Sequence, residues 1–264
     1  MKTHLRPIAF ITASTDHGTL ILNRNDFRLT PAGGYGVGYQ ILTNTSFDRE
    51  EVEFVKELLL QRRNFFGDGV VAIDCGANIG VHTVEWSRLM YDWGTVLAIE
   101  AQERIFYALA GNISINNCLN ARAIWAAVGG TSGSIGVPTP NYLVPSSFGS
   151  LELRQTARTE YIGQDINYSD VQQTNLISID ELNLERIDLI KLDVEGMELE
   201  VLQGARKSIE KFCPQIIAEK IKLDEVTLKA TLHSFGYKLY PLGINILAIH
   251  GSDPTTNLIS NDSI

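Results

Sequence analysis

Short apolar runs alternate with helical patterns along most of this chain, and no other feature restricts its possible folds as strongly. The runs predict strands at 70–73, 95–99, 121–128, 187–192 and 215–218. Helical sequence follows the first run as far as residue 90 and occupies 102–117, 196–212 and 224–235. Apolar runs of this length are typical of parallel strands buried on both faces. Strands that alternate with helices predict an α/β fold with a mostly parallel sheet.

The last two expected strands, 237–240 and 245–249, are joined by only the four residues 241–244. Such a linker is too short for a helical crossover, so these two strands must pair antiparallel. The sequence therefore predicts a Rossmann-like, doubly wound sheet that closes with an antiparallel hairpin. A dinucleotide-binding dehydrogenase has no need of that hairpin.

Two segments depart from this rhythm. Residues 1–45 carry turn residues at short intervals and are predicted to form short β-hairpins, an N-terminal β-rich cap on a main domain that spans 46–264. Within the main domain we expect an insertion at 129–175. Its first part, 129–150, is rich in Gly, Pro and Ser and is predicted to be a long loop or an inserted hairpin.

The composition narrows the possible partners. Acidic residues outnumber basic ones, 31 to 22, the formal net charge is −9, and no basic run is present. Because a nucleic-acid binder needs Lys and Arg to neutralise phosphates, no nucleic-acid partner is expected. No segment approaches the ~20 apolar residues that cross a bilayer, so no membrane association is expected. Cys75, Cys118 and Cys213 form no CxxC pair. This favours a reducing compartment, and we expect a cytoplasmic protein.

A glycine-containing turn, Asp74-Cys75-Gly76-Ala77-Asn78-Ile79-Gly80, ends the first expected strand. Gly76 and Gly80 permit a tight strand-to-helix turn and a close approach of a ligand to the backbone. Asp74 takes the place of the first glycine of a pyrophosphate-binding turn. A carboxylate there repels the two phosphates of a dinucleotide, but it suits a ligand that carries an ammonium group.

Glu100 ends the second expected strand, twenty residues beyond Gly80. A carboxylate at this position accepts hydrogen bonds from both ribose hydroxyls of a bound nucleotide. The strand before the turn, the helix after it and this spacing together predict a nucleoside-binding site. The alternative is a pair of ordinary turn glycines and a solvated acid at a strand end.

Asp-x-Gly-Ala-Asn-Ile-Gly at 74–80, Glu100 and, most specifically, Ile-Asp-Leu-Ile-Lys-Leu-Asp-Val-Glu-Gly-Met-Glu-Leu-Glu-Val-Leu-Gln-Gly-Ala at 187–205 resemble the FkbM family of methyltransferases. The resemblance covers about residues 50–250. It implies S-adenosylmethionine as cofactor and the class I methyltransferase fold, with a mostly parallel seven-stranded sheet and a final antiparallel β-hairpin. It also implies methyl transfer to a hydroxyl (O-methylation), often on a sugar or natural product, and thus a small-molecule or saccharide acceptor.

The cofactor site that the turn and the resemblance together imply consists of Asp74, Gly76, Ala77, Asn78, Gly80, Glu100, Ala101, Gln102 and Ala126. Asp74 is expected to hold the ammonium of S-adenosylmethionine, directly or through water. Ala101 and Gln102 stand where many family members have proline after the acid, which weakens the expectation for the adenine contacts. The Gln102 amide could bond the adenine edge or simply face water. Ala126 and Ala127 are small where adenine should lie.

Lys191, Asp193 and Glu195 are the expected catalytic residues, because ligands of open α/β sheets bind beyond the carboxyl ends of the strands. Lys191 and Asp193 are two residues apart, so they share a strand face and should be neighbours. We expect Asp193 or Glu195 to accept the proton of an acceptor hydroxyl. The alternative is structural, with Lys191 and Asp193 as an ion pair and Glu195 stabilising a helix N-terminus.

His82, Glu219 and Tyr142 are candidate substrate contacts. His82 follows the glycine turn, Glu219 ends the fifth strand, and Tyr142 lies in the 129–150 loop, which could be a substrate lid. His82 could equally be a packed side chain, and the loop a surface hairpin. Asp193 and Glu219 could together hold Mg²⁺, but the sequence offers no evident third ligand, so no metal is expected.

Two other functions remain open from the residues alone. An NAD-dependent oxidoreductase would use the same turn and Glu100 in spite of Asp74. A non-catalytic cofactor-binding module would keep the fold without the chemistry. The oligomeric state is also open, a dimer included.

Overall fold

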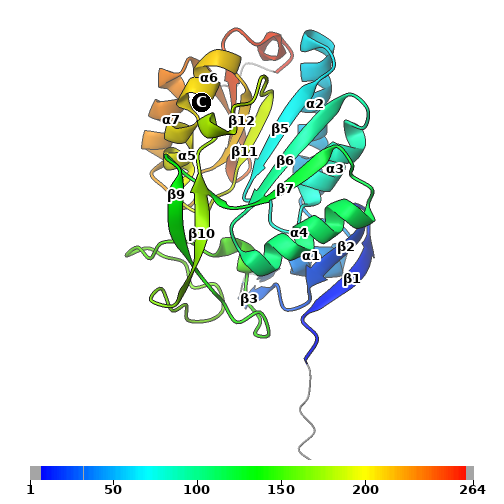
Figure 1. Cartoon of the computed structure of the whole chain (residues 1–264), viewed down its shortest axis with the longest axis vertical. Helices are drawn as coiled ribbons and strands as arrows, with labels where there is room; N and C mark the ends of the chain where they lie inside the picture. Colours follow the sequence, from blue (N-terminus) through cyan, green and yellow to red (C-terminus); the bar gives the residue numbers. More distant parts are fainter. Residues whose placement is uncertain (1–6, 32, 260–264) are drawn as a thin grey trace, which may run out of the picture.

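A seven-stranded sheet forms the centre of the molecule in the computed structural model, which describes residues 7–31 and 33–259 (Figure 1). The strands lie in the order β13-β14-β12-β11-β5-β6-β7. Their bounds are β5 Val70–Cys75, β6 Gly94–Glu100, β7 Ala121–Trp125, β11 Leu189–Leu192, β12 Gln215–Glu219, β13 Tyr237–Leu242 and β14 Asn245–His250. The strands from β12 to β7 in this order run parallel, and β14 pairs antiparallel with both β12 and β13. The expected parallel sheet with a final antiparallel hairpin is confirmed.

Helices cover both faces of the sheet, because apolar side chains alternate between the two faces along each strand. One face carries α2 (Arg49–Phe66), α3 (Val81–Leu89) and α4 (Glu103–Ile115). The other carries α5 (Glu198–Gly204), α6 (Arg206–Phe212) and α7 (Glu225–Ser234). Within β5, Ala72 packs with the first group of helices and Ile73 with the second. The core therefore consists of one apolar layer on each side of the sheet.

The expected third strand, 121–128, is broken at Ala126. Pairing between β6 and β7 ends at Glu100 and Trp125. The next residues, β8 (Ala127–Val128), join β9 (Gly133–Pro138) and β10 (Val171–Ile177) in a separate sheet of order β8-β10-β9. The sequence left two possibilities for 129–150, a loop or a hairpin. In the structure this segment contains the strand β9, which pairs antiparallel with β10. Short 3₁₀ turns follow at η1 (Phe148–Ser150), η2 (Asp180–Leu182) and η3 (Pro254–Asn257).

The N-terminal segment combines two hairpins with a helix. β1 (Phe10–Thr15) pairs with β2 (Gly18–Asn23), β3 (Arg28–Thr30) pairs with β4 (Gly33–Tyr35), and α1 (Val37–Asn44) follows. The sequence predicted hairpins alone over 1–45, of which 1–6 and 32 lie outside the described residues. A helix forms because Val37 and Ile41 are one helical turn apart and are buried in the same cluster as Ile79. We call the described part of 1–45 the cap.

The expected helix 196–212 is two short helices that meet at Ala205, and the first begins only at Glu198. The chain passes very close to the insertion here. A Cβ on Gly204 would lie 2.2 Å from the carbonyl oxygen of Gly129, so only glycine fits. In the described ranges, no helix is both long and apolar enough to cross a membrane.

Candidate active site

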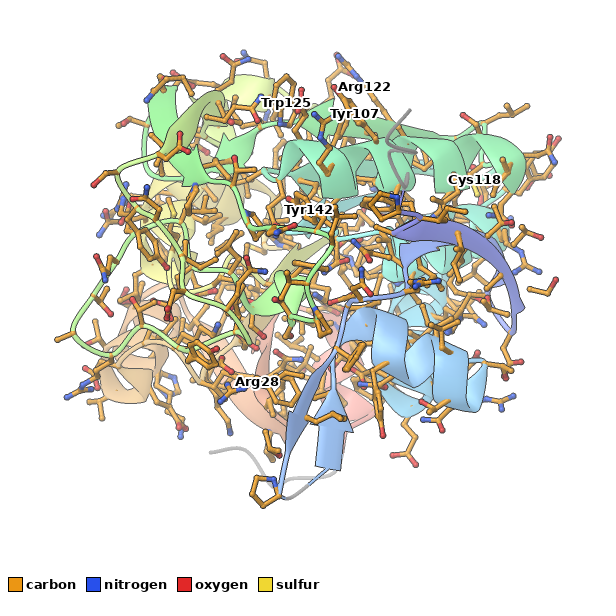
Figure 2. The ribbon with its side chains drawn as sticks, turned by 90° about the horizontal axis from the view of Figure 1, so that it is seen from below. Arg28, Tyr107, Cys118, Arg122, Trp125 and Tyr142 are labelled. Carbon is orange, nitrogen blue, oxygen red and sulfur yellow. The ribbon has the colours of Figure 1, made fainter. Side chains whose placement is uncertain are left out.

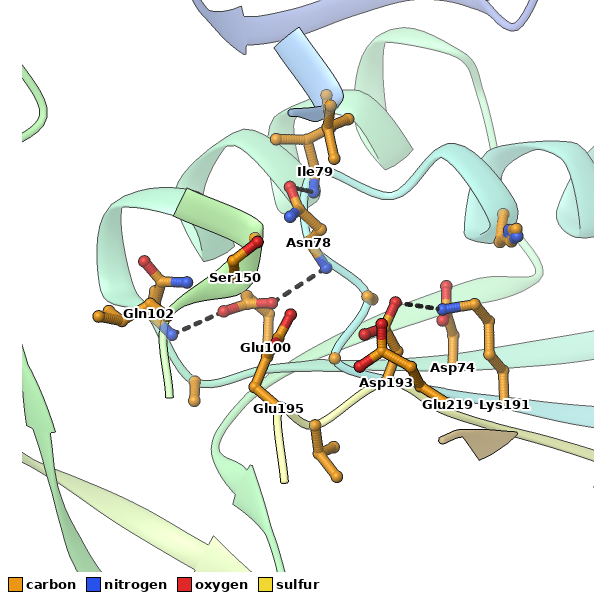
Figure 3. Close-up of a pocket in the computed structure, with 18 of the residues that line it drawn as sticks. Asp74, Asn78, Ile79, Glu100, Gln102, Ser150, Lys191, Asp193, Glu195 and Glu219 are labelled. Carbon is orange, nitrogen blue, oxygen red and sulfur yellow. Dashed lines mark hydrogen bonds and ion pairs between the residues drawn. The ribbon is translucent and has the colours of Figure 1, made fainter. Parts of the chain in front are cut away.

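A pocket of about 340 Å³ opens at the carboxyl ends of the parallel strands, where ligands of such sheets bind. Its walls come from the glycine turn after β5, from the ends of β6, β11 and β12, and from segments of the cap and the insertion. Its volume lies within the range of small-molecule and cofactor sites. Figure 3 shows its two parts, with Glu100, Asn78 and Gln102 on one side and Asp74, Lys191 and Asp193 on the other.

The turn after β5 requires glycine because the backbone at the end of β11 lies against it. Gly76 has a φ of 77°, and a Cβ there would lie 1.7 Å from the carbonyl oxygen of Asp193. No other residue could occupy this position without moving the end of β11. Asn78 also lies in the left-handed region, at a φ of 51°, and its Oδ1 accepts a hydrogen bond from the N–H of Ile79 at 2.8 Å.

Glu100 faces the pocket with a carboxylate that only backbone groups bind. Its Oε2 accepts the N–H of Asn78 at 3.0 Å and its Oε1 accepts the N–H of Gln102 at 2.8 Å. Burial raises the pKa of Glu100 to about 7, against these lowering hydrogen bonds. It forms no ion pair with any described residue. Each oxygen can accept a further hydrogen bond, so this carboxylate fits the two hydroxyls of a ribose.

Gln102 lines the pocket, but its amide does not point freely into it. Its Nε2 donates to the carbonyl oxygen of Phe148 at 2.8 Å, and its Oε1 accepts from the hydroxyl of Tyr142 at 3.2 Å. The side chain is buried and does not simply face water, and its contact with an adenine edge stays a prediction. Both partners belong to the insertion, which folds back onto the start of α4. The small residues Ala77, Ala101 and Ala126 line the pocket as the sequence suggested.

Asp74, Lys191 and Asp193 form a charged group on the other side, in which Asp74 and Lys191 are buried and the Asp193 side chain is 38% exposed. Lys191 lies opposite Asp74 in the register of β11 and β5, and its Nζ donates to Asp193 Oδ2 at 2.8 Å. The expected contact between Lys191 and Asp193 is confirmed. Asp74 Oδ2 accepts the hydroxyl of Thr83 at 2.7 Å, and burial raises the pKa of Asp74. Burial also acts to lower the pKa of Lys191, but Asp193, Asp74 and Glu51 outweigh it and raise that pKa above its ordinary value.

Glu195 does not open the following helix. It has a φ of 55° and precedes Gly196, in a turn that ends before α5. Glu198 binds the backbone here instead, because its Oε1 accepts the N–H groups of Val194 and Gly196 at 3.1 and 3.3 Å. The Glu195 side chain is thereby free to line the pocket, where it pairs with the ammonium of Lys222. A left-handed conformation is costly for a residue with a side chain, and such strain clusters at functional sites.

Glu219 completes an acidic group with Asp193 and Glu195. It is 7% exposed, and its Oε2 has no hydrogen-bond partner among the described residues. One carboxylate oxygen from each of the three acids lies within 4.8 Å of the others. Burial and the charge of Asp193 raise the pKa of Glu219 to about 8. Burial and the same charge raise the pKa of Glu195 well above its ordinary value.

His82 lines the same pocket and contacts an acid that the sequence did not single out. Its Nε2 lies 3.4 Å from Glu51 Oε1, and Glu51 Oε2 accepts the amide of Asn245 at 2.7 Å. Burial and the charge of Lys191 lower the pKa of His82 well below its ordinary value, so the ring is neutral. Glu51 lies in the acidic first turn of α2, where an acid also stabilises the helix dipole, so its position gave no separate signal. Neither Asn245 nor Lys222 stands in a motif that could have revealed it.

Tyr142 does not line the main pocket, and its role as a substrate contact stays a prediction. Its ring packs against Phe148 and Phe10, with centroids 4.9 and 6.2 Å away. It borders a separate pocket that Arg104 and Leu143 also line. Apolar packing determines the position of the Tyr142 ring, which fills the space between the insertion and the cap. The parts of the insertion that line the main pocket are 147, 149–151, 153 and 160.

Fold and site together define a class. The strand order, the antiparallel β14, the glycine turn and the acid that ends β6 are those of a class I, S-adenosylmethionine-dependent methyltransferase. Residues 74–239 match the family model of the methyltransferase FkbM domain. The match spans more than half of the chain, which therefore belongs to the FkbM family of methyltransferases. This decides against the oxidoreductase that the residues alone left open.

The chain is also similar to individual proteins. The chain is 27% identical over 207 residues to Methyltransferase 1 of Beauveria bassiana (strain ARSEF 2860), with 71% of this chain and 81% of that protein covered. It is 26% identical over 168 residues to Methyltransferase sdnD of Sordaria araneosa, with 56% and 64% covered. A crystal structure of methyltransferase FkbM from Methylobacillus flagellatus KT matches 69% of this chain and 43% of that chain, at 17% identity and a TM-score of 0.48.

Proposed function

We propose that this enzyme transfers the methyl group of S-adenosylmethionine to a hydroxyl of a small polyhydroxyl acceptor such as a saccharide. One observation carries the proposal. Glu100, which suits a ribose, and the carboxylates of Asp193, Glu195 and Glu219, which suit a proton-donating acceptor, line a single pocket. A cofactor held by the first would direct its reactive end toward the second.

The cofactor half is assigned to the glycine turn, Glu100 and the small side chains beside it. Glu100 would accept both ribose hydroxyls, and Ala101 and Ala126 leave room for a flat base. Asp74 would act on the ammonium group through its negative charge, since Thr83 already binds one of its oxygens. When bound, S-adenosylmethionine supplies a methyl group activated by a positively charged sulfur.

The acceptor half must take up a proton as the hydroxyl oxygen forms its new bond. Asp193 and Glu195, the acids that we predicted for this task, line this half, and Glu219 lies beside them. A carboxylate whose pKa is raised by burial is a stronger base when ionised than a solvated one, and this applies to Glu195 and Glu219. Lys191 holds Asp193 in place and acts as a positioning residue.

Contacts between the cap and the insertion support a selective acceptor site. Glu160 Oε1 accepts the hydroxyl of Tyr35 at 2.7 Å and lies 3.3 Å from Arg28 Nη1, while its Oε2 lies 3.3 Å from Lys222 Nζ. Arg28 is marked in Figure 2. Lys222 in turn contacts Glu195, so one chain of polar contacts runs from the cap to the acidic group. The cap and the insertion therefore line the acceptor side of the pocket with polar groups, which favours a polyhydroxyl acceptor over a lipid.

The test uses S-adenosylmethionine labelled with ¹³C in the methyl group and matched acceptor pairs, each a sugar and its amino-sugar analogue. NMR distinguishes the O-methyl from the N-methyl product. We expect label on oxygen with at least one sugar of the panel. Label on nitrogen alone would replace the hydroxyl acceptor by an amine, which an acidic pocket would also attract.

A further inference from the structure

The acidic group at the ends of β11 and β12 has the spacing of a cation site. Oxygens of Asp193, Glu195 and Glu219 lie within 4.8 Å of one another. Oxygen ligands lie ~2.0–2.6 Å from Mg²⁺ or Ca²⁺, so one ion can bind oxygens placed like this. The sequence argument against a metal rested on the lack of a third ligand. The left-handed turn at Glu195 supplies that ligand, because it directs the side chain into the pocket rather than onto the helix.

A second observation concerns Glu219. Asp193 has Lys191 as its partner and Glu195 has Lys222, but Glu219 forms no ion pair within the described part of the chain. Its Oε2 is buried and has no hydrogen-bond partner there. Buried carboxylate oxygens are almost always bonded to something. An unpartnered one that faces two other acids indicates a missing positively charged group.

Acidic residues also outnumber basic residues in the lining of the pocket as a whole. The charged residues in its lining are, on the basic side, Lys191, and on the acidic side, Asp48, Glu51, Asp74, Glu100, Glu160, Asp193, Glu195 and Glu219. Lys222 adds one positive charge just behind the lining. S-adenosylmethionine itself brings one net positive charge, so the acidic groups of the lining still outnumber the positive charges when it is bound. Oxygen-rich, negatively charged sites select hard divalent cations.

We propose that Asp193, Glu195 and Glu219 bind one divalent cation of the Mg²⁺ type in the acceptor half of the pocket. The ion would supply the charge that Glu219 lacks, and its remaining positions would be open to water or to acceptor oxygens. A hydroxyl bound to such an ion loses its proton more readily. The proposal deepens the methyl-transfer function, but its test needs neither cofactor nor acceptor, so either proposal can fail alone.

The experiment measures binding of Mn²⁺, used as a paramagnetic substitute for Mg²⁺, to full-length enzyme that has been stripped with EDTA and desalted. Free Mn²⁺ is followed by EPR at about pH 8, where a bound cation displaces the protons that remain on the carboxyl ligands. We expect one Mn²⁺ per chain, displaced by Mg²⁺. Mg²⁺ should also raise the melting temperature, since a ligand that binds only the folded state stabilises it.

Two variants distinguish an ion that the three acids coordinate from a cation that is attracted only by the negative charge of the pocket. Glu219→Gln keeps the shape and removes one ligand charge, so Mn²⁺ affinity should fall at least ~10-fold. Glu51→Gln removes a charge from the same pocket outside the three acids and should change affinity less than about threefold, as expected for a screened charge. Circular dichroism checks that both variants fold. No Mn²⁺ binding at millimolar concentration, or equal losses in the two variants, would overturn the proposal.

Discussion

The carboxylate of Asp26, in the cap, accepts the backbone N–H of Phe148, which lies 122 positions further along the chain, at 3.0 Å. Its other oxygen accepts the N–H of Gly38 at 3.0 Å. Asp26 is only 3% exposed. One buried side chain thus joins the cap to the part of the insertion that borders the pocket. The packing of these two segments against each other depends on it.

Asp26→Ala should destabilise the protein more at pH 5 than at pH 8. Burial raises the pKa of Asp26 from 3.8 to about 6, so its contribution to stability is complete below 3.8 and is lost as the pH rises through about 6. Between the two pH values the effect of the variant should shrink by about 1 kcal/mol. Urea unfolding at both pH values measures this. A variant whose effect grows with pH would contradict the raised pKa.

Glu100→Ala should weaken S-adenosylmethionine binding at least tenfold without unfolding the protein. Two hydroxyls that lose a charged acceptor cost about 1.5–3 kcal/mol. Calorimetric titration gives the dissociation constant, and thermal unfolding checks the fold. Glu103→Ala is the matched control, because Glu103 is an acid at the start of α4, three positions after Glu100, that contacts Tyr107 and Arg104 and is not among the residues that line the main pocket. An unchanged constant for Glu100→Ala would remove the ribose assignment.

The affinity for S-adenosylmethionine should rise with pH around neutrality. Glu100, with a pKa raised by burial to about 7, accepts ribose hydroxyls best when ionised. From pH 8 to pH 6 the affinity should fall about tenfold, and in Glu100→Ala this dependence should be lost. The stability of the free protein depends on pH in the opposite direction. The contribution of Glu100 to the free energy of unfolding is present below its ordinary pKa of 4.5 and is lost as the pH rises through about 7. Titrations at three pH values would decide, and a flat profile would contradict the prediction.

Lys191→Met should lower the free energy of unfolding by about 2–3 kcal/mol near neutral pH, because it leaves the buried carboxyl of Asp74 and the partly exposed carboxylate of Asp193 without their shared partner. Lys229→Met is the control. Lys229 pairs with Glu225 on the surface of α7, where an ion pair contributes at most about 1 kcal/mol. Chemical denaturation of both variants gives the comparison. Equal losses would mean that Lys191 is no more important to the fold than a surface lysine.

Asp193→Asn should reduce methyl transfer at least ~100-fold and leave S-adenosylmethionine affinity within about threefold. The substitution keeps the shape of the side chain but removes its charge, so it can neither accept a proton nor hold a cation as strongly. Single-turnover kinetics with saturating cofactor isolates the effect on transfer. Near-normal turnover would show that the residue is structural, the partner of Lys191 and nothing more.

The sequence by itself determined the fold and placed the residues proposed for the cofactor at the ends of β5 and β6. Strand and helix periods are local, so the apolar runs before Asp74 and Glu100 predicted parallel strands whose ends carry these acids. The spacing of Lys191 and Asp193 predicted their contact for the same reason. These inferences succeed because the alternation of side chains along a strand does not depend on the rest of the molecule.

The tertiary structure alone decided what meets in the acceptor half. Glu51 and Asn245 are 194 positions apart, and Glu195 reaches Glu219 only because its backbone adopts a left-handed turn. The packing of Tyr142 against Phe10 and Phe148, between the cap and the insertion, was likewise not predicted from the sequence. Such contacts depend on how distant segments pack, and a residue's type or neighbours in the chain do not record which segment will lie against it.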